Sequence, residues 1–400
     1  MTRTTGTERE PEGAATAGAV DVACAAPGDG AVTWEDLERD ARGRVVVAMS
    51  GGVDSSVVGA LLQQEGYDVV GISMRLYAQR HGTPGKSCCS PDDLLDAREV
   101  AGTFGFPFYV ANYQEAFQER VVKYFVDEYR RGRTPSPCVL CNDHLKFDIL
   151  LERMQALDGQ FLATGHYARL ERRDGRVALL RGVDELKDQS YFLFGLSRDV
   201  LPLLRFPLGG MRKPEVRELA HQLGVPTAAK RESQDICFVA GGSYADFVEA
   251  RLEPGEVRPG RLVLAADGRE LGRHEGIHRF TVGQRRGLGI AWPEPLYVRS
   301  IDAESGDVVV DVAEGLGVVR FELDRCNWLR WAEPPASFEA LAQVRYRHRP
   351  VPARVEPVAG DPTRAVVTLI EPERGVTPGQ ATVLYDGDEV LGGGWVERCL

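Results

Sequence analysis

The stretch Val45-Val46-Val47-Ala48-Met49-Ser50-Gly51-Gly52-Val53-Asp54-Ser55-Ser56 decides the fold of the N-terminal half of the chain. Its first residues are apolar and predict a buried strand, and the run that begins at Ser55 predicts a helix. The glycine pair between them predicts a turn that aims backbone N–H groups and the positive end of the helix at one point. Such a turn suits a phosphate. Ser50 and Ser55 add hydroxyl donors, and Asp54 adds a carboxylate that could hold a metal ion or orient a nucleophile.

The length and composition exclude several classes of protein. A chain of 400 residues has room for two or three domains. No apolar run approaches the roughly 18 residues of a membrane span, and the N-terminus has no apolar core for a signal peptide. The eight cysteines lack the spacing of a small disulfide-rich domain. They therefore indicate reduced thiols and a cytoplasmic location. Because no apolar run is long enough to span a membrane, we also expect no membrane partner.

The charge is unevenly distributed along the chain. The net charge is −11, which at first argues against a nucleic-acid partner. Residues 1–40 contain nine acidic and three basic residues, however, and so account for more than half of that charge. This segment is also poor in large apolar residues. We interpret it as a disordered acidic extension with a short helix at 34–40.

From residue 41 to 245 the pattern alternates between strands and helices. The predicted strands are 45–49, 68–74, 108–110 and 161–163. The helices between them include one with Ser90 as its N-cap and Gly105 at its end, one spanning 117–129 and one spanning 143–157. This alternation predicts an α/β domain with a Rossmann-like parallel sheet and helices on both faces. Ligands bind at the carboxyl ends of such strands, where Ser50, Met74 and Gly165 lie.

After residue 245 the chain becomes rich in short β-strands. We expect a small central β-rich domain over 246–314 and a C-terminal antiparallel β-barrel or sandwich over 315–400. The predicted C-terminal strands are 318–323, 342–347, 364–369 and 381–385. Alternation along the second of these strands and its continuation places Arg345, Arg347 and Arg349 on one face. Because no acidic residue interrupts this segment, we expect that face to bind RNA rather than to be only a solvated surface.

Two cysteine segments are candidates for chemistry. In residues 133–142, two prolines stiffen a loop that leads Cys138 and Cys141 to the start of the predicted helix. A helix N-terminus stabilises a thiolate, so Cys141 is a candidate nucleophile. A zinc site is disfavoured because the Cys-x-x-Cys pair has no second pair to complete it. Cys237 lies between Ile236 and Phe238, and by composition alone it is interpreted as a small buried hydrophobic residue.

Six motifs together resemble one family, the tRNA-specific 2-thiouridylases. The glycine turn itself resembles the pyrophosphate-binding (PP) loop of the ATP pyrophosphatases. The motifs lie at 50–55, 135–142, 163–168, 187–191, 233–238 and 280–288, in the order found in that family. The resemblance covers residue 43 to the C-terminus. It implies a PP-loop ATPase domain over 41–245 and an enzyme, a tRNA-uridine 2-sulfurtransferase.

The resemblance also implies a mechanism and partners. ATP would adenylate the O2 carbonyl oxygen of the wobble uridine in the anticodon loop of a tRNA. A cysteine persulfide would then deliver sulfur to C2, and AMP would leave. Cys237 would carry the persulfide, and Cys141 would close a disulfide with it as sulfur is released, with Asp54 as the third catalytic residue. The sulfur would come from a relay protein or a cysteine desulfurase, and the enzyme would be a monomer.

The resemblance assigns two sets of contacts. The set for ATP, with Mg²⁺, is Ala48, Met49, Ser50, Gly51, Gly52, Val53, Asp54, Ser55, Met74 and Gly165. The set for tRNA is Ser136, Pro137, Cys138, His166, Lys187, Asp188, Gln189, Arg345, Tyr346 and Gln380.

One residue departs from the family pattern. Many members carry Asp at the position of Cys138. Three cysteines, Cys138, Cys141 and Cys237, are therefore available for an iron–sulfur cluster, which is an alternative route for the thiolation. Two further alternatives are another PP-loop tRNA-modifying ligase and a non-catalytic RNA-binding protein with a relict nucleotide loop. Neither needs a cysteine pair, so Cys141 and Cys237 argue against both.

Overall fold

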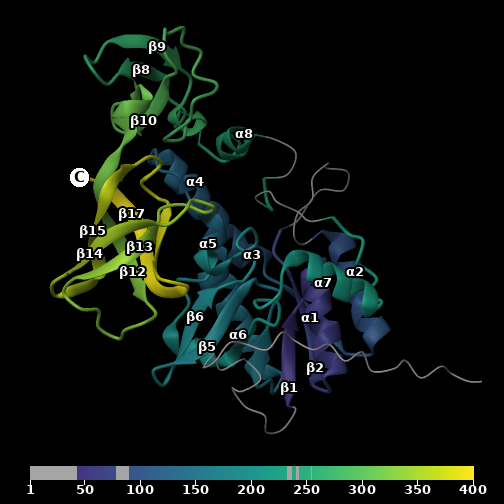
Figure 1. The fold of residues 1–400 in the computed structure, drawn as a ribbon. Coiled ribbons are helices and arrows are strands. Elements are labelled where there is room, and N and C mark those ends of the chain that lie inside the picture. Colours follow the sequence, from purple (N-terminus) through teal and green to yellow (C-terminus); the bar gives the residue numbers. More distant parts are fainter. Residues whose placement is uncertain (1–42, 78–89, 232–236, 240–242, 254) are drawn as a thin grey trace, which may run out of the picture. The chain divides into compact units, whose positions relative to one another are not determined.

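The computed structural model describes residues 43–77, 90–231, 237–239, 243–253 and 255–400. The acidic extension expected over 1–40, and the helix expected within it, lie outside these residues. Within the described part, the order of elements follows the predicted division into an α/β part, a central β-rich part and a C-terminal barrel (Figure 1).

A five-stranded parallel sheet organises the N-terminal part. Its strand order is β3-β2-β1-β4-β7. The strands are β1 (Arg44–Ala48), β2 (Asp68–Arg75), β3 (Phe108–Asn112), β4 (Phe161–Ala163) and β7 (Leu204–Arg205). All of the pairings between them are parallel. The predicted Rossmann-like sheet is therefore confirmed, and the sequence did not indicate the two-residue strand β7.

Helices cover both faces of this sheet, because successive apolar side chains of β1 point to opposite faces and both faces must be buried. Val45 and Val47 belong to one hydrophobic cluster, whereas Val46 belongs to another. The first cluster includes helices α1 (Val53–Gln64), α2 (Pro91–Phe104) and α7 (Lys213–Gln222), which gather on one side in Figure 1. The second includes helix α3 (Gln114–Phe117), the π-helical turn η2 (Gln118–Val122), and helices α4 (Lys123–Arg130) and α6 (Asp148–Ala156).

The caps of α2 are those that the sequence predicts. The Ser90 hydroxyl accepts a hydrogen bond from the backbone N–H of Asp93 at 3.1 Å, and the Asp93 carboxylate accepts one from the Ser90 N–H at 3.0 Å. Gly105 ends the helix with φ 76°, a left-handed conformation that favours glycine.

The helix that carries the two cysteines begins earlier than predicted. It starts at Pro137 rather than at residue 143, and runs through α5 (Pro137–Cys141), the π-helical turn η3 (Asn142–Phe147) and α6. Proline suits the first turn of a helix because its missing N–H has no partner there. Cys138 therefore lies in the first turn and is exposed, whereas Cys141 lies one turn further in and is buried. The expected helix N-terminus at Cys141 is wrong.

A hairpin that the sequence did not indicate follows β4. Its strands, β5 (Ala168–Arg173) and β6 (Arg176–Arg181), are antiparallel. Leu180 of β6 pairs with Glu389 of the last barrel strand, so the hairpin extends the barrel sheet. The described residues also contain the 3-10 turns η4 (Ser190–Phe192), η5 (Arg198–Leu203), η6 (Ile277–Arg279) and η7 (Ala313–Leu316).

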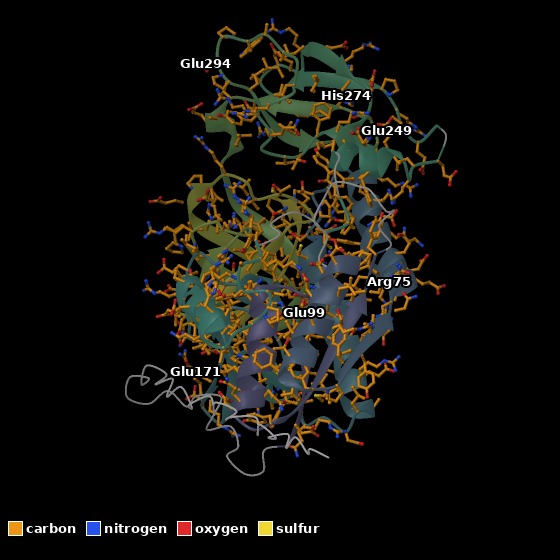
Figure 2. All side chains as sticks on the ribbon, turned by 90° about the vertical axis from the view of Figure 1, so that its right-hand side faces the viewer. Arg75, Glu99, Glu171, Glu249, His274 and Glu294 are labelled. Carbon is orange, nitrogen blue, oxygen red and sulfur yellow. The ribbon has the colours of Figure 1, made fainter. Side chains whose placement is uncertain are left out.

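The central part is a small β-sheet with one short helix. The strands β8 (Gly260–Leu264), β9 (Glu270–His274), β10 (Tyr297–Ile301) and β11 (Val308–Asp311) lie in the order β10-β11-β8-β9 around their own apolar core. The helix α8 (Tyr244–Glu249) contributes Glu249, which contacts Arg279 and lies 3.3 Å from Nε2 of the buried His278. Figure 2 labels Glu249 of α8 and His274 of β9 in this part.

The C-terminal part is a closed antiparallel barrel. Its strands are β12 (Val318–Trp328), β13 (Phe338–Gln343), β14 (Val351–Val358), β15 (Asp361–Glu373), β16 (Ala381–Asp386) and β17 (Glu389–Cys399). The barrel closes because β12 pairs with both β15 and β17. The barrel expected from the sequence is confirmed.

One predicted barrel strand is wrong in its second half. The strand expected over 342–347 ends at Gln343, and Arg345, Arg347 and Arg349 lie in the connection that follows it. The reason is the register, in which Ala342 pairs with Val351, so the intervening residues must reverse the chain. Arg347 has φ 62° in this turn. The three arginines are exposed, but they do not share the face of a strand.

Candidate active site

The glycine turn between β1 and α1 is a preorganised cradle. Gly51 has φ 71°, and a Cβ atom there would lie 2.0 Å from the carbonyl oxygen of Asp93. Gly52 is the N-cap of α1 and has no side chain to cover the first N–H groups. The buried Ser55 hydroxyl accepts a hydrogen bond from the Ser50 N–H at 3.1 Å. Ser55 therefore holds the turn, while Ser50 is exposed.

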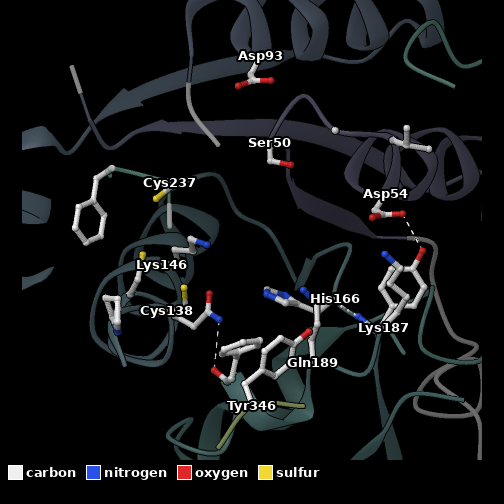
Figure 3. Close-up of a pocket in the computed structure, with 18 of the residues that line it drawn as sticks. Ser50, Asp54, Asp93, Cys138, Lys146, His166, Lys187, Gln189, Cys237 and Tyr346 are labelled. Carbon is white, nitrogen blue, oxygen red and sulfur yellow. Dashed lines mark hydrogen bonds between the residues drawn. The ribbon is translucent and has the colours of Figure 1, made fainter. Parts of the chain in front are cut away.

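A buried lysine holds the carboxylate of Asp54. Nζ of Lys213, the first residue of α7, lies 2.7 and 2.8 Å from the two carboxylate oxygens. The Tyr167 hydroxyl donates a third hydrogen bond to Asp54 at 2.8 Å (Figure 3). The Lys213 side chain is only 9% exposed. This arrangement places a cation beside the N-terminus of α1, where phosphates bind.

A second lysine connects the turn to α2 and to the chain that leads to Cys237. Nζ of Lys230 donates to the Gly51 carbonyl at 2.9 Å and to Asp93 at 2.6 Å, and it also contacts Asp96. Burial alone would lower the pKa of Lys230. The hydrogen bonds and charges of Asp93 and Asp96 outweigh that effect, so the pKa is raised above its ordinary value. Lys230 therefore stays cationic beside the turn.

A pocket of about 390 Å³ lies in front of the glycine turn. Six of its lining residues are basic and two are acidic. The basic ones are Lys146, Lys187, Lys213, Lys230, Arg231 and Arg347, and the acidic ones are Asp54 and Asp93. This local excess of positive charge suits polyanions such as ATP and RNA, although the whole chain is acidic.

All three candidate cysteines line this one pocket. Cys138 is exposed, Cys141 is buried and Cys237 is half-buried. Figure 3 shows Cys138, Lys146 and Cys237 along one side of the pocket. Phe238 anchors the chain beside Cys237, because its ring lies 5.2 Å from that of Phe125 in an edge-to-face arrangement. Cys237 packs against the core and also faces the pocket, which composition alone could not indicate.

The side chains of this pocket fit one of the groups that the family resemblance implies and not the others. The open N-terminus of α1, the Gly51 turn and the nearby lysines fit the phosphates of ATP. Within the described part of the chain, no three or more His, Cys, Asp or Glu side chains are grouped so that they could hold a metal ion. The three thiols are thus not gathered as cluster ligands, and both Asp54 oxygens accept hydrogen bonds from Lys213. We assign no step to Mg²⁺ or to a cluster.

The far end of the pocket has aromatic character. The rings of Phe192 and Tyr346 lie 4.3 Å apart, tilted by 46°. Nδ1 of His166 lies 2.7 Å from the Thr164 hydroxyl oxygen. Burial, with a smaller effect from Lys146, lowers the pKa of His166 to about 3, so this ring is neutral at physiological pH. These rings form a surface on which a base can stack.

The structure brings together some of the expected site residues and not others. In the pocket lining are Ser50, Gly52, Val53, Asp54, Pro137, Cys138, Cys141, His166, Lys187, Gln189, Cys237 and Tyr346. Outside it lie Ala48, Met49, Gly51, Ser55, Met74, Gly165, Ser136, Asp188, Arg345 and Gln380. Two of these residues, Gly165 and Ser136, pack against or hydrogen-bond to neighbouring parts of the chain. A Cβ at Gly165 would lie 3.0 Å from the backbone of Asp54 and Ser55, and the Ser136 hydroxyl accepts from the Ala381 N–H at 3.3 Å.

Asp188 is one such supporting residue. Its carboxylate accepts hydrogen bonds from the N–H groups of Gly182 and Ser190, at 3.0 and 3.1 Å. Arg181 and the Ser190 hydroxyl also donate to it, at 3.1 and 2.9 Å. The Asp188 side chain therefore shapes the loop that carries Lys187 and Gln189.

Several residues of the pocket could not be predicted from the sequence. They are Lys146, Tyr167, Leu186, Phe192 and Lys213. No local pattern marks Lys213, because a lysine before Pro214 at a helix start is ordinary. Lys146 follows Cys141 within one helix, and this spacing is the one signal that could have indicated it. The π-helical turn η3, which begins after Cys141 and contains Lys146, could not be predicted from the sequence.

Comparison with known proteins shows the family. Residues 43–241 match the family model described as a tRNA methyl transferase HUP domain. Residues 245–311 match a tRNA methyl transferase PRC-barrel domain, and residues 319–396 match an aminomethyltransferase β-barrel domain. The chain is 52% identical to the tRNA-specific 2-thiouridylase MnmA of Geobacter metallireducens, over 91% of this chain and 99% of that protein. The chain belongs to the tRNA-specific 2-thiouridylase family.

Other relatives agree with this membership of the 2-thiouridylase family. The tRNA-specific 2-thiouridylases MnmA of Geotalea uraniireducens and Solibacter usitatus are 48% and 50% identical, over 91% and 88% of this chain and 97% and 99% of those proteins. Among solved structures, the U34-tRNA thiolase NcsA of Methanococcus maripaludis is 18% identical over 55% of this chain and 70% of that chain, with a TM-score of 0.31. That likeness is too weak to support an inference. None of the helices in the described residues combines the length and apolarity that crossing a membrane requires.

Proposed function

We propose that this chain is a tRNA-uridine 2-sulfurtransferase that uses ATP to replace the O2 oxygen of the wobble uridine with sulfur. One observation carries the proposal: a single basic pocket contains the glycine turn, the cysteines and an aromatic surface. The three parts correspond to the three reactants, which are the ATP phosphates, the transferred sulfur and the base. Family membership, at about half identity over most of the chain, supports the same substrate.

The nucleotide end of the pocket would carry out adenylation. An amide-like carbonyl resists displacement of its oxygen, so that oxygen must first become a good leaving group. The O2 atom attacks the α-phosphorus of ATP, pyrophosphate leaves, and the base becomes an adenylate. The N–H groups at the start of α1, with Lys213 beside them, stabilise the phosphate charge. The exposed Ser50 hydroxyl donates to the same phosphates.

The cysteines would carry out the sulfur transfer. The terminal sulfur of a Cys237 persulfide attacks C2 of the adenylated uridine, and AMP leaves with the former O2 oxygen. The Cys141 thiolate then attacks Sγ of Cys237, which breaks the sulfur–sulfur bond to the base and forms a Cys141–Cys237 disulfide. Two electrons from a thiol reductant restore both thiols. The position of both cysteines in one pocket supports this sequence of steps.

The remaining assignments follow from the same proposal. The PP-loop domain spans 41–245, the central domain 246–314 and the barrel 315–400. The anticodon loop of the tRNA lies against the far end of the pocket, near Tyr346 and Lys187. A sulfur-relay protein or a cysteine desulfurase loads Cys237, and the enzyme works as a cytoplasmic monomer.

A second route has one observation in its favour: Cys138 is a third thiol in the same pocket. An iron–sulfur cluster on Cys138, Cys141 and Cys237 would use all three. We favour the persulfide route because it needs only Cys141 and Cys237, and because the three thiols are not grouped as metal ligands in the described part of the chain. In that route Cys138 only modulates the rate, and Cys138→Asp, which restores the commoner family residue, keeps substantial activity.

The experiment compares the parent, Cys138→Asp, Cys141→Ser and Cys237→Ser after anaerobic purification, with Cys399→Ser as a control outside the pocket. Thiouridine formation on tRNA and bound iron are both measured. We expect full activity in an iron-free parent, and loss of activity by more than about 100-fold in the Cys141 and Cys237 variants. Activity that tracks iron across the series would establish the cluster route instead. Thiouridine formation in Cys237→Ser at the parental rate would contradict the role of Cys237 as the sulfur carrier, whereas absence of thiouridine formation by the parent would contradict the proposed function.

A further inference from the structure

The loop over 182–190 presents an unusual side chain at the edge of the pocket. Leu186 is 83% exposed, the highest value among the large apolar residues found exposed in the described part of the chain. It nevertheless lines the pocket, next to Lys187. A single exposed leucine on a protein surface needs no explanation. Leu186 calls for an explanation because it lines a site and because hydrogen bonds order its loop.

Hydrogen bonds hold this leucine in place. The Asp184 carboxylate accepts one bond from the Leu186 N–H at 3.1 Å and another from the Lys213 N–H at 2.9 Å. The Asp184 carbonyl accepts from the N–H groups of Lys187 and Asp188, at 2.9 and 2.7 Å. Asp184 thus ties the tip of the loop to α7, whose first residue holds Asp54. These bonds fix the backbone at Leu186 and at the two residues that follow it.

The pocket that Leu186 lines contains two kinds of group that suit RNA, charged side chains and aromatic rings. Lys187 and Arg347 offer positive charge to phosphates, and Phe192 with Tyr346 offers a stacking surface to a base. A uridine that enters this pocket must leave its neighbours in the anticodon loop, which leaves a gap in their stack. Proteins that unstack bases commonly fill such a gap with an apolar side chain, leucine among them.

We propose that Leu186 is a wedge that enters the anticodon loop of the tRNA and occupies the space vacated by the target uridine. The proposal rests on the proposed function, because it assumes that a uridine enters the pocket. It explains why an exposed apolar side chain, next to Lys187, lines this basic pocket. Leu186 acts on the base stack and does not touch ATP or the cysteines.

The test measures unstacking directly. A tRNA with 2-aminopurine immediately 3′ of the target uridine is titrated with the parent, Leu186→Ala, Leu186→Met and the control Leu95→Ala, which truncates an exposed leucine of α2 outside the pocket. We expect 2-aminopurine fluorescence to rise with the parent, Leu186→Met and Leu95→Ala, and to rise less than half as much with Leu186→Ala. Thiolation by Leu186→Ala should be about 10-fold slower, because part of the help that the side chain gives to unstacking is lost. The KM for ATP should be unchanged.

The outcomes separate the wedge from other roles. A full fluorescence rise with Leu186→Ala would overturn the proposal, whatever the thiolation rate. So would a raised KM for ATP, which would place Leu186 in the nucleotide site. Because Leu186 is exposed, its truncation should leave the melting temperature unchanged, and all variants remain comparable. Failure of the parent to form 2-thiouridine would instead contradict the proposed function.

Discussion

The two carboxylate oxygens of Asp54 lie 2.7 and 2.8 Å from Nζ of Lys213, a residue 159 positions later in the chain. The pair joins the N-terminus of α1 to the N-terminus of α7. The sequence predicts that the Asp54 carboxylate, which lies in the first turn of α1, could hold a metal ion or orient a nucleophile. In the structure it also keeps a buried cation beside the phosphate cradle, so its removal affects both the chemistry and the fold.

Replacing either member of this pair should abolish ATP use and lower stability. In Asp54→Asn and Lys213→Met, AMP formation with tRNA should fall by at least about 100-fold, because the phosphates lose a preorganised cation. The free energy of unfolding should fall by about 1–3 kcal/mol, since one partner of the pair is left unsatisfied. The measurements are AMP release and urea denaturation.

A matched variant shows whether these effects are specific to the pair. Glu99→Gln removes a negative charge from an exposed position on α2 and should change neither quantity. In the double variant Asp54→Asn with Lys213→Met, the loss of stability should be smaller than the sum of the two single losses. Additive losses would show that the two side chains do not act together.

Arg347 should bind tRNA phosphate more directly than Arg349. Arg347 lines the pocket and Arg349 does not, although both are exposed in the same connection. Arg347→Glu should weaken tRNA binding. It should also reduce the slope of log affinity against log salt concentration by about the contribution of one phosphate contact. Arg349→Glu carries the same change of charge and is the control. Equal effects of the two variants would mean that only the general charge of the connection matters.

Lys230 should contribute to ATP affinity through the glycine turn. Lys230→Met removes the donor that contacts the Gly51 carbonyl, Asp93 and Asp96. The Kd for ATP, measured by calorimetry without tRNA, should rise by about 10-fold, equivalent to roughly one lost hydrogen bond to a charged group. Lys123→Met, at an exposed position on α4, should leave it unchanged. An unchanged Kd in Lys230→Met would show that the turn keeps its shape without this lysine.

Asp143 should make the protein less stable as the pH rises. Its carboxylate is buried and accepts no hydrogen bond among the described residues. Burial, and secondly the charge of Asp148, raise its pKa well above the ordinary value of 3.8. Between that value and the raised one, the folded state binds a proton that the unfolded state lacks, so stability falls with rising pH.

Asparagine removes this cost because it does not ionise. Asp143→Asn should therefore exceed the parent in unfolding free energy at pH 8 by about 1–3 kcal/mol, the cost of an unsatisfied buried group. The difference should shrink as the pH falls toward 4. Urea denaturation at several pH values measures it. A difference that does not vary with pH would show that Asp143 stays in one protonation state.

Local features of the site could be predicted from the sequence. The strand, glycine turn and helix around Ser50 form because neighbouring residues share one pattern of apolarity and backbone freedom. The caps of α2 at Ser90 and Gly105 are local for the same reason. The start of the cysteine helix was misplaced by six residues because the prolines before it were interpreted as loop, whereas Pro137 occupies the first turn.

The sequence by itself thus determined the strand, glycine turn and helix around Ser50 and the order of the α/β, central and barrel parts. Only the tertiary structure decided that Lys213 meets Asp54 and that Tyr346 and Arg347 of the barrel face the same pocket as Cys237. It also decided that Arg345, Arg347 and Arg349 lie in a turn, because the pairing of β13 with β14 sets where the chain must reverse. The physical reason is that backbone conformation depends on adjacent residues. Contacts between distant residues depend on how whole sheets and helices pack.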